Sequence, residues 1–434
     1  MVNYKVGKLL LALLLLAASC KDDTFEHNPS SPIVINSFLP AQGSGGTEIL
    51  INGANFAGDT SRIKVMINGV PLRIIGVKSD QLMAVVPKGV GTGPVTIQIG
   101  ENQVQSEAVF NYSYTRTVTT LAGSGEAGFA NGKGSEASFN FSGQNWYRSS
   151  GIVVDDQLNV FVADPGNHCI RKIDSAGNVT TLAGDPGQSG FADGKGSKAR
   201  FSLPYSLAID PSGNLYTADP GNGDIRRISP DGTAVTWAMA KQEPWSVAFD
   251  KKTGMVYYTS CNASGNIYPI KQQNVSGDPI VSGLLYPAGI AFDTDGNLYA
   301  SMNGEQVIRN FSAGTWQNKV LAGQVGTPGY VNGAPTAARF SSPWGLAVDA
   351  KGNIYVAGNG TWDGGAYNAD QSIRMIQSES WLVSTFAGSG VAGFADSVGE
   401  SAAFSAPTGV AVDKSGTVYV LDKINNRVRK IVSE

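Results

Sequence analysis

The sequence predicts an all-β protein, made of a small β-sandwich followed by a six-bladed β-propeller. Two patterns lead to this fold. Short alternating apolar runs separated by turn residues fill residues 31–114, and a unit of four short strands then recurs to the end of the chain. Composition agrees, because glycine accounts for 54 of 434 residues and charged residues for only 15%. Many tight turns and few charges are typical of a β-rich protein outside the cytoplasm.

The first twenty residues have the pattern of a secretion signal. Lys5 and Lys8 precede the apolar run Leu9–Leu16, which is too short to span a bilayer. Small residues then precede Cys20, and this arrangement resembles the cleavage box of bacterial lipoproteins. The resemblance implies that residues 1–20 are a signal peptide and that Cys20 is the lipidated first residue of the mature chain. The alternative is an ordinary signal peptide with an incidental cysteine.

Residues 21–30 are polar and predict a tether. The first three, Lys21–Asp23, resemble the lysine-plus-acidic signal that directs some lipoproteins to the outer face of the outer membrane. The expected localisation is therefore the outer membrane, with the lipid-anchored protein facing the cell exterior.

Charge and cysteine content exclude several classes of partner. The formal net charge is −3, so no basic field is present to attract nucleic acid. Beyond Cys20, the only cysteines are Cys169 and Cys261, which lie in different repeats, so their spacing supports no disulfide framework. His27 and His168 are the only histidines, and we expect no structural zinc site and no cofactor.

Residues 31–114 predict the β-sandwich, with strands at Glu48–Ile51, Ile63–Ile67, Leu82–Val86 and Val95–Ile99. Several motifs in this segment resemble an IPT/TIG domain: Gly45–Ile49, Asn52–Phe56, Val85–Pro87 and Phe110–Tyr112. The resemblance implies an immunoglobulin-like sandwich that serves as a spacer or interaction module.

Residues 115–434 predict the propeller. The repeat begins with Pro-x-(Gly/Ser)-apolar-Ala-apolar-Asp, most clearly at Pro204–Asp210 and Pro343–Asp349. Other copies begin near Gly151, Ser246, Gly289 and Gly409. The set resembles the NHL repeat, and six four-stranded units arranged radially give a six-bladed propeller. The segment starts with a fourth-type strand, Val118–Gly123, and ends after a third-type strand, Val428–Ile431, so the first strand is expected to complete the last blade.

We name the strands of each blade a to d from the channel outward. The a–b turns are minimal, and their aspartates, such as Asp210 and Asp293, are interpreted as turn formers. The d–a connections before repeats one, two, five and six are long and carry Gly-Phe-Ala-(Asn/Asp)-Gly or a variant of it. Their aligned aromatics are interpreted as loop anchors: Phe129, Phe191, Tyr330 and Phe394, with Phe139, Phe201, Phe340 and Phe404. Repeats three and four lack these loops, which predicts a notch over blades three and four.

Other aromatic residues lie where strand a begins, at the expected rim of the channel. Aromatic faces suit sugar rings, because the C–H groups of a sugar stack on π-systems. The candidate ligand-binding residues are Tyr205, Trp245, Trp344, Tyr286, Trp146, Tyr147, Trp362 and Tyr367. The alternative is that these rings plug the channel or pack against the long loops.

The repeats also bring aspartate and arginine together. Asp164, Asp219 and Asp422 follow strand b, while Arg171, Arg226 and Arg429 lie in strand c. We interpret them as inter-strand ion pairs, and the alternative is a ring of charges for an acidic ligand. Every strand a is small or apolar, so the inner ring lacks metal ligands, and no catalytic residue is assigned. An enzyme built from loop carboxylates such as Asp363, Asp370 and Glu305 is the remaining alternative.

These features predict a non-catalytic, cell-surface glycan-binding lipoprotein. A lipid anchor, an immunoglobulin-like stalk and a distal binding domain resemble the surface glycan-binding proteins of bacterial polysaccharide-utilisation systems. The resemblance implies capture of an oligosaccharide for an outer-membrane transporter. The main alternative is a protein–protein interaction scaffold, which predicts a broad, flat apolar patch. The second is a propeller enzyme, a lyase or hydrolase.

Overall fold

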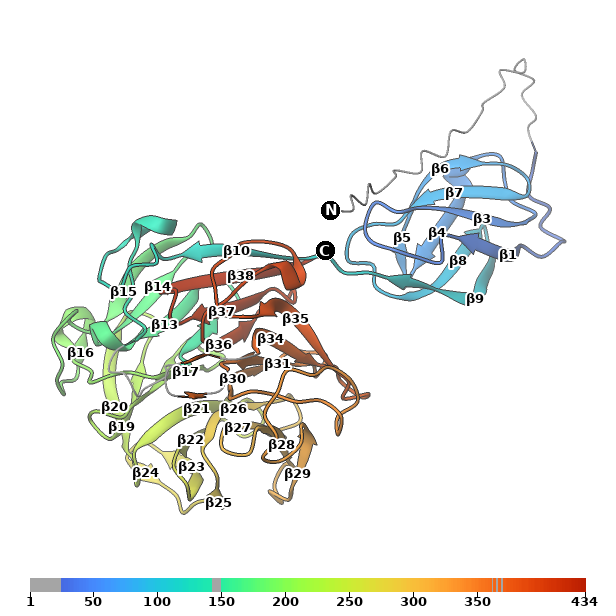
Figure 1. Ribbon diagram of the computed structural model, residues 1–434. Coiled ribbons are helices and arrows are strands. Elements are labelled where there is room, and N and C mark those ends of the chain that lie inside the picture. The colour runs from blue at the N-terminus through green and yellow to red at the C-terminus, as the bar shows by residue number, and fades with distance from the viewer. Residues whose placement is uncertain (1–24, 143–149, 361, 364–365, 368–369) are drawn as a thin grey trace, which may run out of the picture. The chain divides into compact units, whose positions relative to one another are not determined.

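The computed structural model describes residues 25–142, 150–360, 362–363, 366–367 and 370–434, and Cys20 with the signal peptide lies outside them. The chain divides into two compact units, one ending at Tyr114 and one spanning Thr115–Ser433. Both are built from β-strands, as predicted (Figure 1). Within the described ranges, no helix is long and apolar enough to cross a membrane.

The N-terminal unit is an immunoglobulin-like β-sandwich of two sheets. Burial alternates along β8, as one-sided packing requires, and Ile51, Val65 and Phe110 of the shared core are at most 1% exposed. The short 3₁₀ helix η1 spans Thr60–Arg62. One sheet has the order β1 (Val34–Leu39), β3 (Glu48–Ala54), β7 (Gln81–Val85) and β6 (Arg73–Val77). The other has the order β2 (Gln42–Gly43), β9 (Asn102–Tyr112), β8 (Gly93–Ile99), β4 (Ile63–Ile67) and β5 (Val70–Pro71).

The C-terminal unit is a propeller, and its first three sheets follow the chain. Blade 1 contains β12 (Ile152–Val154), β13 (Val160–Asp164), β14 (Cys169–Ile173), β15 (Asn178–Ala183) and the short β11 (Gly132–Lys133). Blade 2 contains β17 (Ser206–Ile209), β18 (Leu215–Asp219), β19 (Asp224–Ile228), β20 (Thr233–Met239) and β16 (Gly194–Lys195). Blade 3 contains β21 (Pro244–Asp250), β22 (Met255–Ser260), β23 (Gly265–Gln272), β24 (Val275–Ser276) and β25 (Val281–Leu284).

The other three sheets have four strands each. Blade 4 contains β26 (Pro287–Phe292), β27 (Leu298–Met302), β28 (Val307–Phe311) and β29 (Asn318–Ala322). Blade 5 contains β30 (Pro343–Val348), β31 (Ile354–Gly358), β34 (Gln371–Ile376) and β35 (Val383–Gly390), with the hairpin β32 (Trp362–Asp363) and β33 (Ala366–Tyr367) between β31 and β34. Blade 6 contains β36 (Pro407–Val412), β37 (Val418–Asp422), β38 (Arg427–Ser433) and β10 (Arg116–Ala122). Short 3₁₀ helices lie at Gly134–Glu136 (η2), Pro165–Asn167 (η3), Gly196–Lys198 (η4) and Gly399–Ser401 (η5).

The blades form a closed ring around a central channel. The innermost strands contact one another in the order β12, β17, β21, β26, β30 and β36, and β36 contacts β12 again. The apolar core is correspondingly divided into clusters that each join two neighbouring blades. Burial between blades is therefore what holds the ring together.

The ends of the propeller segment close the ring as predicted. The antiparallel pair β10–β38 places Val118 opposite Ile431 and Thr119 opposite Lys430. The first strand of the segment therefore supplies the outermost strand of blade 6, and the ring is fastened by hydrogen bonds between the two chain ends.

Serine side chains tie neighbouring inner strands together beside the channel. The Val247 backbone N–H donates to Ser206 Oγ at 3.1 Å, and the Ile290 N–H donates to Ser246 Oγ at 3.2 Å. Both hydroxyls are buried, so these contacts satisfy donors that the sheet ladders leave unpaired. These two bonds fix the inner strand of blade 3 against that of blade 2, and the inner strand of blade 4 against that of blade 3.

Candidate binding site

The turn aspartates act as the sequence predicts. Asp210 accepts hydrogen bonds from the Ser212 and Asn214 backbone N–H groups at 2.9 Å and from the Tyr216 hydroxyl at 3.2 Å. Asp293 repeats the pattern in blade 4. Because Tyr216 lies in β18, the second strand, the Asp210 carboxylate is directed into its own blade. Burial of Tyr216 raises the pKa of its phenol to about 12, so the hydroxyl remains a donor.

The predicted aspartate–arginine pairs are present and buried. Arg171 contacts Asp164 at 2.9 Å, and Arg429 contacts Asp422 at 2.7 Å, with all four side chains 0% exposed. In blade 2 the contact of Arg226 with Asp219 is longer, at 4.0 Å, and the nearest carboxylate is Asp193 at 2.8 Å. Because these arginines are fully buried, they are not placed to contact an acidic ligand, which was the alternative interpretation of the repeated charges.

Each of these arginines is also enclosed by the long d–a loop. Arg171 Nη2 donates to the Ala130 carbonyl at 2.7 Å and to Asn131 Oδ1 at 2.9 Å. Its guanidinium lies 4.6 Å from the Phe129 ring centre and 5.1 Å from that of Phe139. The same sandwich holds Arg226, Arg374 and Arg429 between Phe191 and Phe201, Tyr330 and Phe340, and Phe394 and Phe404. The aligned aromatics are therefore loop anchors, as predicted.

Two of the three loop carboxylates considered for an enzyme are paired with arginines. Asp370 contacts Arg374 at 3.2 Å, and Glu305 contacts Arg309 at 2.7 Å. Blade 5 has Gly358 at the position where other blades have the aspartate that ends strand b. A Cβ atom on Gly358 would lie 2.6 Å from the carboxyl carbon of Asp370, so the Asp370 carboxylate occupies the space that this aspartate would need. Burial raises the pKa of Asp370 to about 6, although Arg374 opposes this shift. The side chain of Asp363 lies outside the described residues.

His168, the only histidine of the propeller segment, has a structural role. Its Nδ1 accepts a hydrogen bond from the Leu203 N–H at 3.2 Å, and burial lowers its pKa, so the neutral ring is favoured. Cys169 and Cys261 are buried free thiols, and burial raises the pKa of each. Over the described ranges, no group of three or more histidine, cysteine, aspartate or glutamate side chains is placed to hold a metal ion.

Three of the predicted aromatic residues meet at the d–a end of the channel. The ring centres of Tyr205 and Trp245 are 5.9 Å apart, and those of Trp245 and Trp344 are 6.1 Å apart. Trp344 packs with Cys261, Ala288 and Trp245 in one cluster. Tyr205 and Trp344 are only 2% and 6% exposed, whereas Trp245 is partly buried. The expectation of an open rim therefore fails for Tyr205 and Trp344, which fill space beside the channel.

Tyr286 lies in the notch predicted over blades 3 and 4. The connections there are short, because the chain passes from Met239 to Pro244 and from Leu284 to Pro287. Tyr286 is 42% exposed and has a left-handed backbone with φ of 50°. Its N–H donates to the Asn262 carbonyl at 2.9 Å. The ring is thus presented to solvent on a fixed backbone.

Gln242 is a polar residue of this notch that the sequence reasoning did not single out. Its Oε1 accepts hydrogen bonds from Ser260 Oγ at 2.7 Å and from Asn266 Nδ2 at 3.0 Å. Within the described part of the chain, no acceptor contacts its Nε2, so the amide is held with a donor available. The sequence feature that could have pointed to Gln242 is the short Lys-Gln-Glu-Pro-Trp connection before strand a, where other repeats have a long loop.

Four other predicted residues are not placed by the structure. Trp146 and Tyr147 lie outside the described residues. The backbones of Trp362 and Tyr367 pair across the β32–β33 hairpin, but the positions of their side chains are likewise not described.

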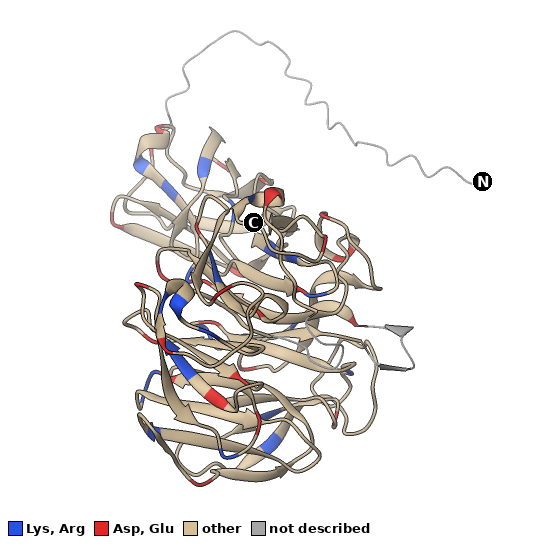
Figure 2. Cartoon of the chain, turned by 90° about the vertical axis from the view of Figure 1, so that its left-hand side faces the viewer, with Lys and Arg blue, Asp and Glu red and all other residues tan. Residues whose placement is uncertain are grey.

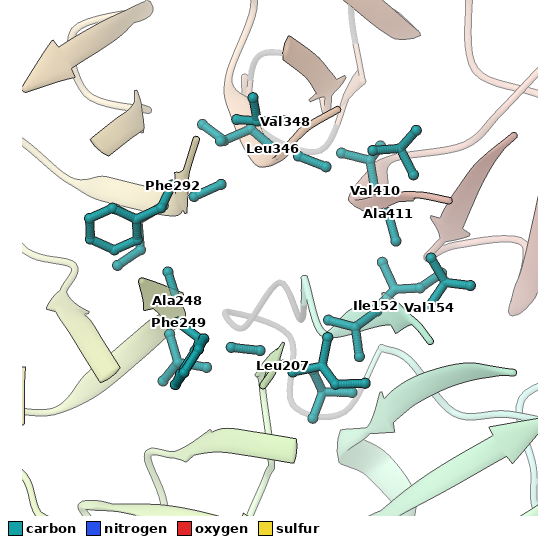
Figure 3. Close-up of a pocket in the computed structure, with 18 of the residues that line it drawn as sticks. Ile152, Val154, Leu207, Ala248, Phe249, Phe292, Leu346, Val348, Val410 and Ala411 are labelled. Atoms are coloured by element: carbon teal, nitrogen blue, oxygen red, sulfur yellow. The ribbon is translucent and has the colours of Figure 1, made fainter. Parts of the chain in front are cut away.

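The other end of the channel holds an open cavity of about 210 Å³. Residues from every inner strand line it, including Ile152, Leu207, Phe249, Phe292 and Val348, and Figure 3 shows these side chains arranged in a ring. Lining residues such as Phe249 directly precede the a–b turns, so this mouth lies on the opposite face from Trp245 and Tyr286. No site residue had been predicted here, because the strand pattern was interpreted only as lacking metal ligands.

Figure 2 shows lysine and arginine interspersed with aspartate and glutamate over the described strands and loops. This distribution agrees with the formal net charge of −3.

Comparison with known proteins supports both predicted segment types. Residues 32–115 match the IPT/TIG domain model, and residues 404–431 match the NHL repeat model. The chain is 26% identical over 330 residues to the chloroplast protein SUPPRESSOR OF QUENCHING 1 of Arabidopsis thaliana, and 27% identical over 330 residues to NHL repeat-containing protein 2 of Bos taurus. These alignments cover 72% and 68% of this chain but span only 27% and 42% of the relatives.

Solved structures resemble nearly the whole chain. A Bacteroides thetaiotaomicron protein of unknown function has a TM-score of 0.65 at 19% identity, covering 94% of this chain and 100% of its own. Auxiliary nutrient binding proteins from Bacteroides thetaiotaomicron and Bacteroides ovatus have TM-scores of 0.57 and 0.56 at 21% and 22% identity. Each alignment covers 94% of this chain, together with 99% of the Bacteroides thetaiotaomicron protein and 100% of the Bacteroides ovatus protein. At these identities the likeness concerns the fold, an immunoglobulin-like sandwich joined to a propeller.

Proposed function

We propose that this protein is a non-catalytic binding protein that captures an oligosaccharide at the cell surface. A lipid anchor at Cys20 would hold it on the outer membrane, where it passes the ligand to an uptake system. The proposal extends to this chain the nutrient-binding role named for two structural relatives of matching length. Because fold alone does not fix function, the proposed role rests on the residues beside blades 3 and 4.

The observation that carries the proposal is that Tyr286, Trp245 and Gln242 all lie against the segment Ser260–Asn262 of blade 3. An exposed ring on a fixed backbone can stack on a sugar face, and Trp245 adds a second, partly buried ring. The Gln242 amide, held by Ser260 and Asn266, can donate to a sugar hydroxyl. Rigid aromatic surface with a few oriented polar groups is the usual design of a small-ligand site.

The test uses the chain from Lys21 onward in native gels that contain individual plant, microbial and host polysaccharides. We expect one polysaccharide to retard the wild-type protein. Retardation should be lost in a Tyr286→Ala/Trp245→Ala variant that melts like the wild type. Tyr114→Ala is the matched control, since Tyr114 is 45% exposed but lies in the sandwich. No retardation by any polysaccharide, or the formation of cleaved product, would count against the proposal.

A protein partner is the second candidate, and one surface favours it. The d–a connections before repeats five and six expose apolar side chains that neither loop anchoring nor the channel requires: Val325 (55%), Val331 (45%), Val391 (69%) and Val398 (49%). Exposed apolar residues gathered on neighbouring loops are typical of interaction surfaces. A Val391→Ser/Val325→Ser variant that retains glycan binding but no longer co-purifies with an outer-membrane transporter would establish this role.

A further inference from the structure

We propose that the outer edge of blade 4 is a docking site for a partner protein. The segment that it binds is extended and carries an aromatic residue two positions before an asparagine. The site consists of Arg309 in β28 and the outermost strand, β29. It goes beyond the proposed glycan binding and does not depend on it.

Four blades cover the outer edge of strand d with the long loop that precedes them, here called the covering loop. In blade 1, Gly132 of this loop pairs with Val179 of β15, and in blade 2, Gly194 pairs with Ala234 of β20. Single bridges cover the corresponding edges of blades 5 and 6. An open edge strand presents unpaired N–H and C=O groups, so the covering loops satisfy backbone groups that face outward.

Blade 4 lacks a covering loop, because residues 285 and 286 alone connect it to the last strand of blade 3. Its strand d, β29, is the last strand of its sheet and lies at the outer side of the ring (Figure 1). Asn318 and Lys319 are exposed, and Val320 is 36% exposed. Within the described ranges, no backbone hydrogen bond joins Asn318–Leu321 to a segment outside blade 4. The outward backbone groups of β29 are therefore available to an added strand.

Blade 4 nevertheless keeps the arginine that the covering loops enclose in other blades. Arg309 lies opposite Ala300 of strand b, as Arg226 lies opposite Thr217. Two aromatic rings enclose the Arg226 guanidinium, whereas none lies over that of Arg309 in the part of the chain that the structure describes. The side chain of Arg309 is 21% exposed, against 0% for Arg226. Arg309 thus has the position of an enclosed arginine without the loop that encloses it.

The covering loop of blade 1 shows which groups recognise such an arginine. The Phe129 ring centre lies 4.6 Å from the Arg171 guanidinium. Arg171 Nη2 donates to the Ala130 carbonyl at 2.7 Å and to Asn131 Oδ1 at 2.9 Å. A ring, a carbonyl and a side-chain oxygen on three successive residues therefore fit one guanidinium.

Strand d adds a backbone donor beside the arginine. In blade 2 the Thr236 N–H donates to Asp193 Oδ1 of the covering loop at 2.9 Å. Thr236 lies opposite Arg226, and Val320 lies opposite Arg309 in the same way. The Val320 N–H is therefore expected to face outward, where the side-chain oxygen of a docked segment can accept it.

Arg309 has donors left for such a segment. Its Nε and Nη2 contact Glu305 at 2.8 and 2.7 Å, and its Nη1 donates to Asn318 Oδ1 at 2.9 Å. A guanidinium carries five N–H donors. Beyond these three contacts, two donors remain for the carbonyl and side-chain oxygens that Arg171 receives from its own loop, counted over the described residues.

Glu305 sets the choice between asparagine and aspartate in the docked segment. Its carboxylate already balances the charge of Arg309, and it is partly exposed. An aspartate that reached the same guanidinium would be repelled by this carboxylate, whereas an asparagine offers the same acceptor oxygen without charge. Blade 4 is thus expected to prefer the asparagine form.

Two covering loops of this chain supply matched probes, because residues 128–134 and 190–196 differ only at Asn131 and Asp193. Fluorescence anisotropy measures the binding of labelled Gly-Phe-Ala-Asn-Gly-Lys-Gly and Gly-Phe-Ala-Asp-Gly-Lys-Gly to the chain from Lys21 onward. We expect one asparagine peptide to bind per chain, the aspartate peptide to bind about two- to fivefold more weakly, and an asparagine peptide with alanine in place of phenylalanine about tenfold more weakly. Absence of binding, equal binding without the ring, or a preference for aspartate would each overturn the proposal.

Variants locate the binding at blade 4. Arg309→Lys keeps the charge but removes the planar stacking surface, and it should weaken the asparagine peptide about fivefold. Arg200→Lys is the matched control, because Arg200 also pairs with one carboxylate, Asp185 at 3.0 Å, but lies in the covering loop of blade 2. Unchanged affinity in a folded Arg309→Lys variant would refute the site.

Hydrogen exchange gives a second measurement that needs no variant. Saturating asparagine peptide should slow exchange of the Val320 amide in the wild-type protein, because a docked segment accepts this N–H. An amide that exchanges equally fast with and without the bound peptide would contradict strand addition. Polysaccharide retardation should persist in Arg309→Lys, so the docking site and the glycan site fail independently.

Discussion

Single residues decide how this protein buries charge. The Nη groups of each enclosed arginine are surrounded by acceptors: Arg171 also donates from Nη1 to the Ser138 carbonyl at 3.0 Å and to Asp164. A buried guanidinium is tolerated only when its donors are paired, because desolvation costs several kcal/mol per ion. The long d–a loops supply these acceptors, so arginine and loop depend on each other.

Arg171→Met should therefore destabilise the propeller by about 3–5 kcal/mol, since it leaves the Asp164 carboxylate buried without its partner. Urea denaturation measures the loss. The Arg171→Met/Asp164→Asn double variant should recover part of it, because the unpaired charge is removed as well. Equal losses in the single and double variants would contradict the ion-pair account.

Blade 2 has an additional buried carboxylate. Asp224 lies opposite Asp219 across β18 and β19, and both are 0% exposed. Burial raises the pKa of Asp224 to about 7 and, with repulsion from Asp224, that of Asp219 to about 8, against an ordinary value of 3.8. Between pH 4 and 8 the folded state thus binds more protons than the unfolded state, so stability falls as pH rises.

Asp224→Asn should flatten this dependence and raise the free energy of unfolding at pH 8 by about 1–3 kcal/mol, because asparagine cannot ionise and so removes the cost of a buried charge. At pH 4 the variant and the wild type should differ little. Denaturation curves across this range give the answer, and a wild-type stability that increases from pH 4 to 8 would be inconsistent with the raised pKa values.

Ion-pair partners could be predicted from the sequence where the aspartate and the arginine recur at the same positions in several repeats. Asp164 with Arg171 and Asp422 with Arg429 recur at the same spacing, so their pairing could be inferred. The partner of Arg374 could not, because Asp370 follows the insertion and fills space left by Gly358. Burial of Tyr205 and Trp344 was also beyond the sequence, since neighbours from other blades decide it.

At the scale of elements, the stability of the ring depends on its closing strand. Alternate backbone groups of β10 point away from β38, as the Val118 N–H bonded to the Ser397 carbonyl at 2.8 Å shows. The Thr119 N–H therefore points toward β38. Strand order and closure were predictable, because hydrophobic alternation and repeat phase are properties of the sequence itself.

Thr119→Pro should lower the melting temperature of the propeller, since proline removes a ladder hydrogen bond in the closing pair. Thr119→Ala is the control: it removes only an exposed side chain and keeps the N–H. Differential scanning calorimetry should place the alanine variant within about 1–2 °C of the wild type. Equal melting of the proline variant would show that closure contributes little.

For the whole molecule, the propeller offers two chemically different ends on one channel. One end has aromatic and amide groups beside blades 3 and 4, and the other has the open cavity between the six inner strands. The sequence predicted the first end from its short connections. It did not predict the second, because a cavity arises from six strands meeting at one level and no single repeat reveals it.

The most direct test of the account is calorimetric titration of the chain from Lys21 onward with an oligosaccharide of the polysaccharide that retards it. We predict one site per chain and a loss of affinity of about tenfold, or ~1.4 kcal/mol, in Tyr286→Ala with Tyr114→Ala unchanged. Undiminished binding by a folded Tyr286→Ala/Trp245→Ala variant would contradict the claim that the notch captures the glycan.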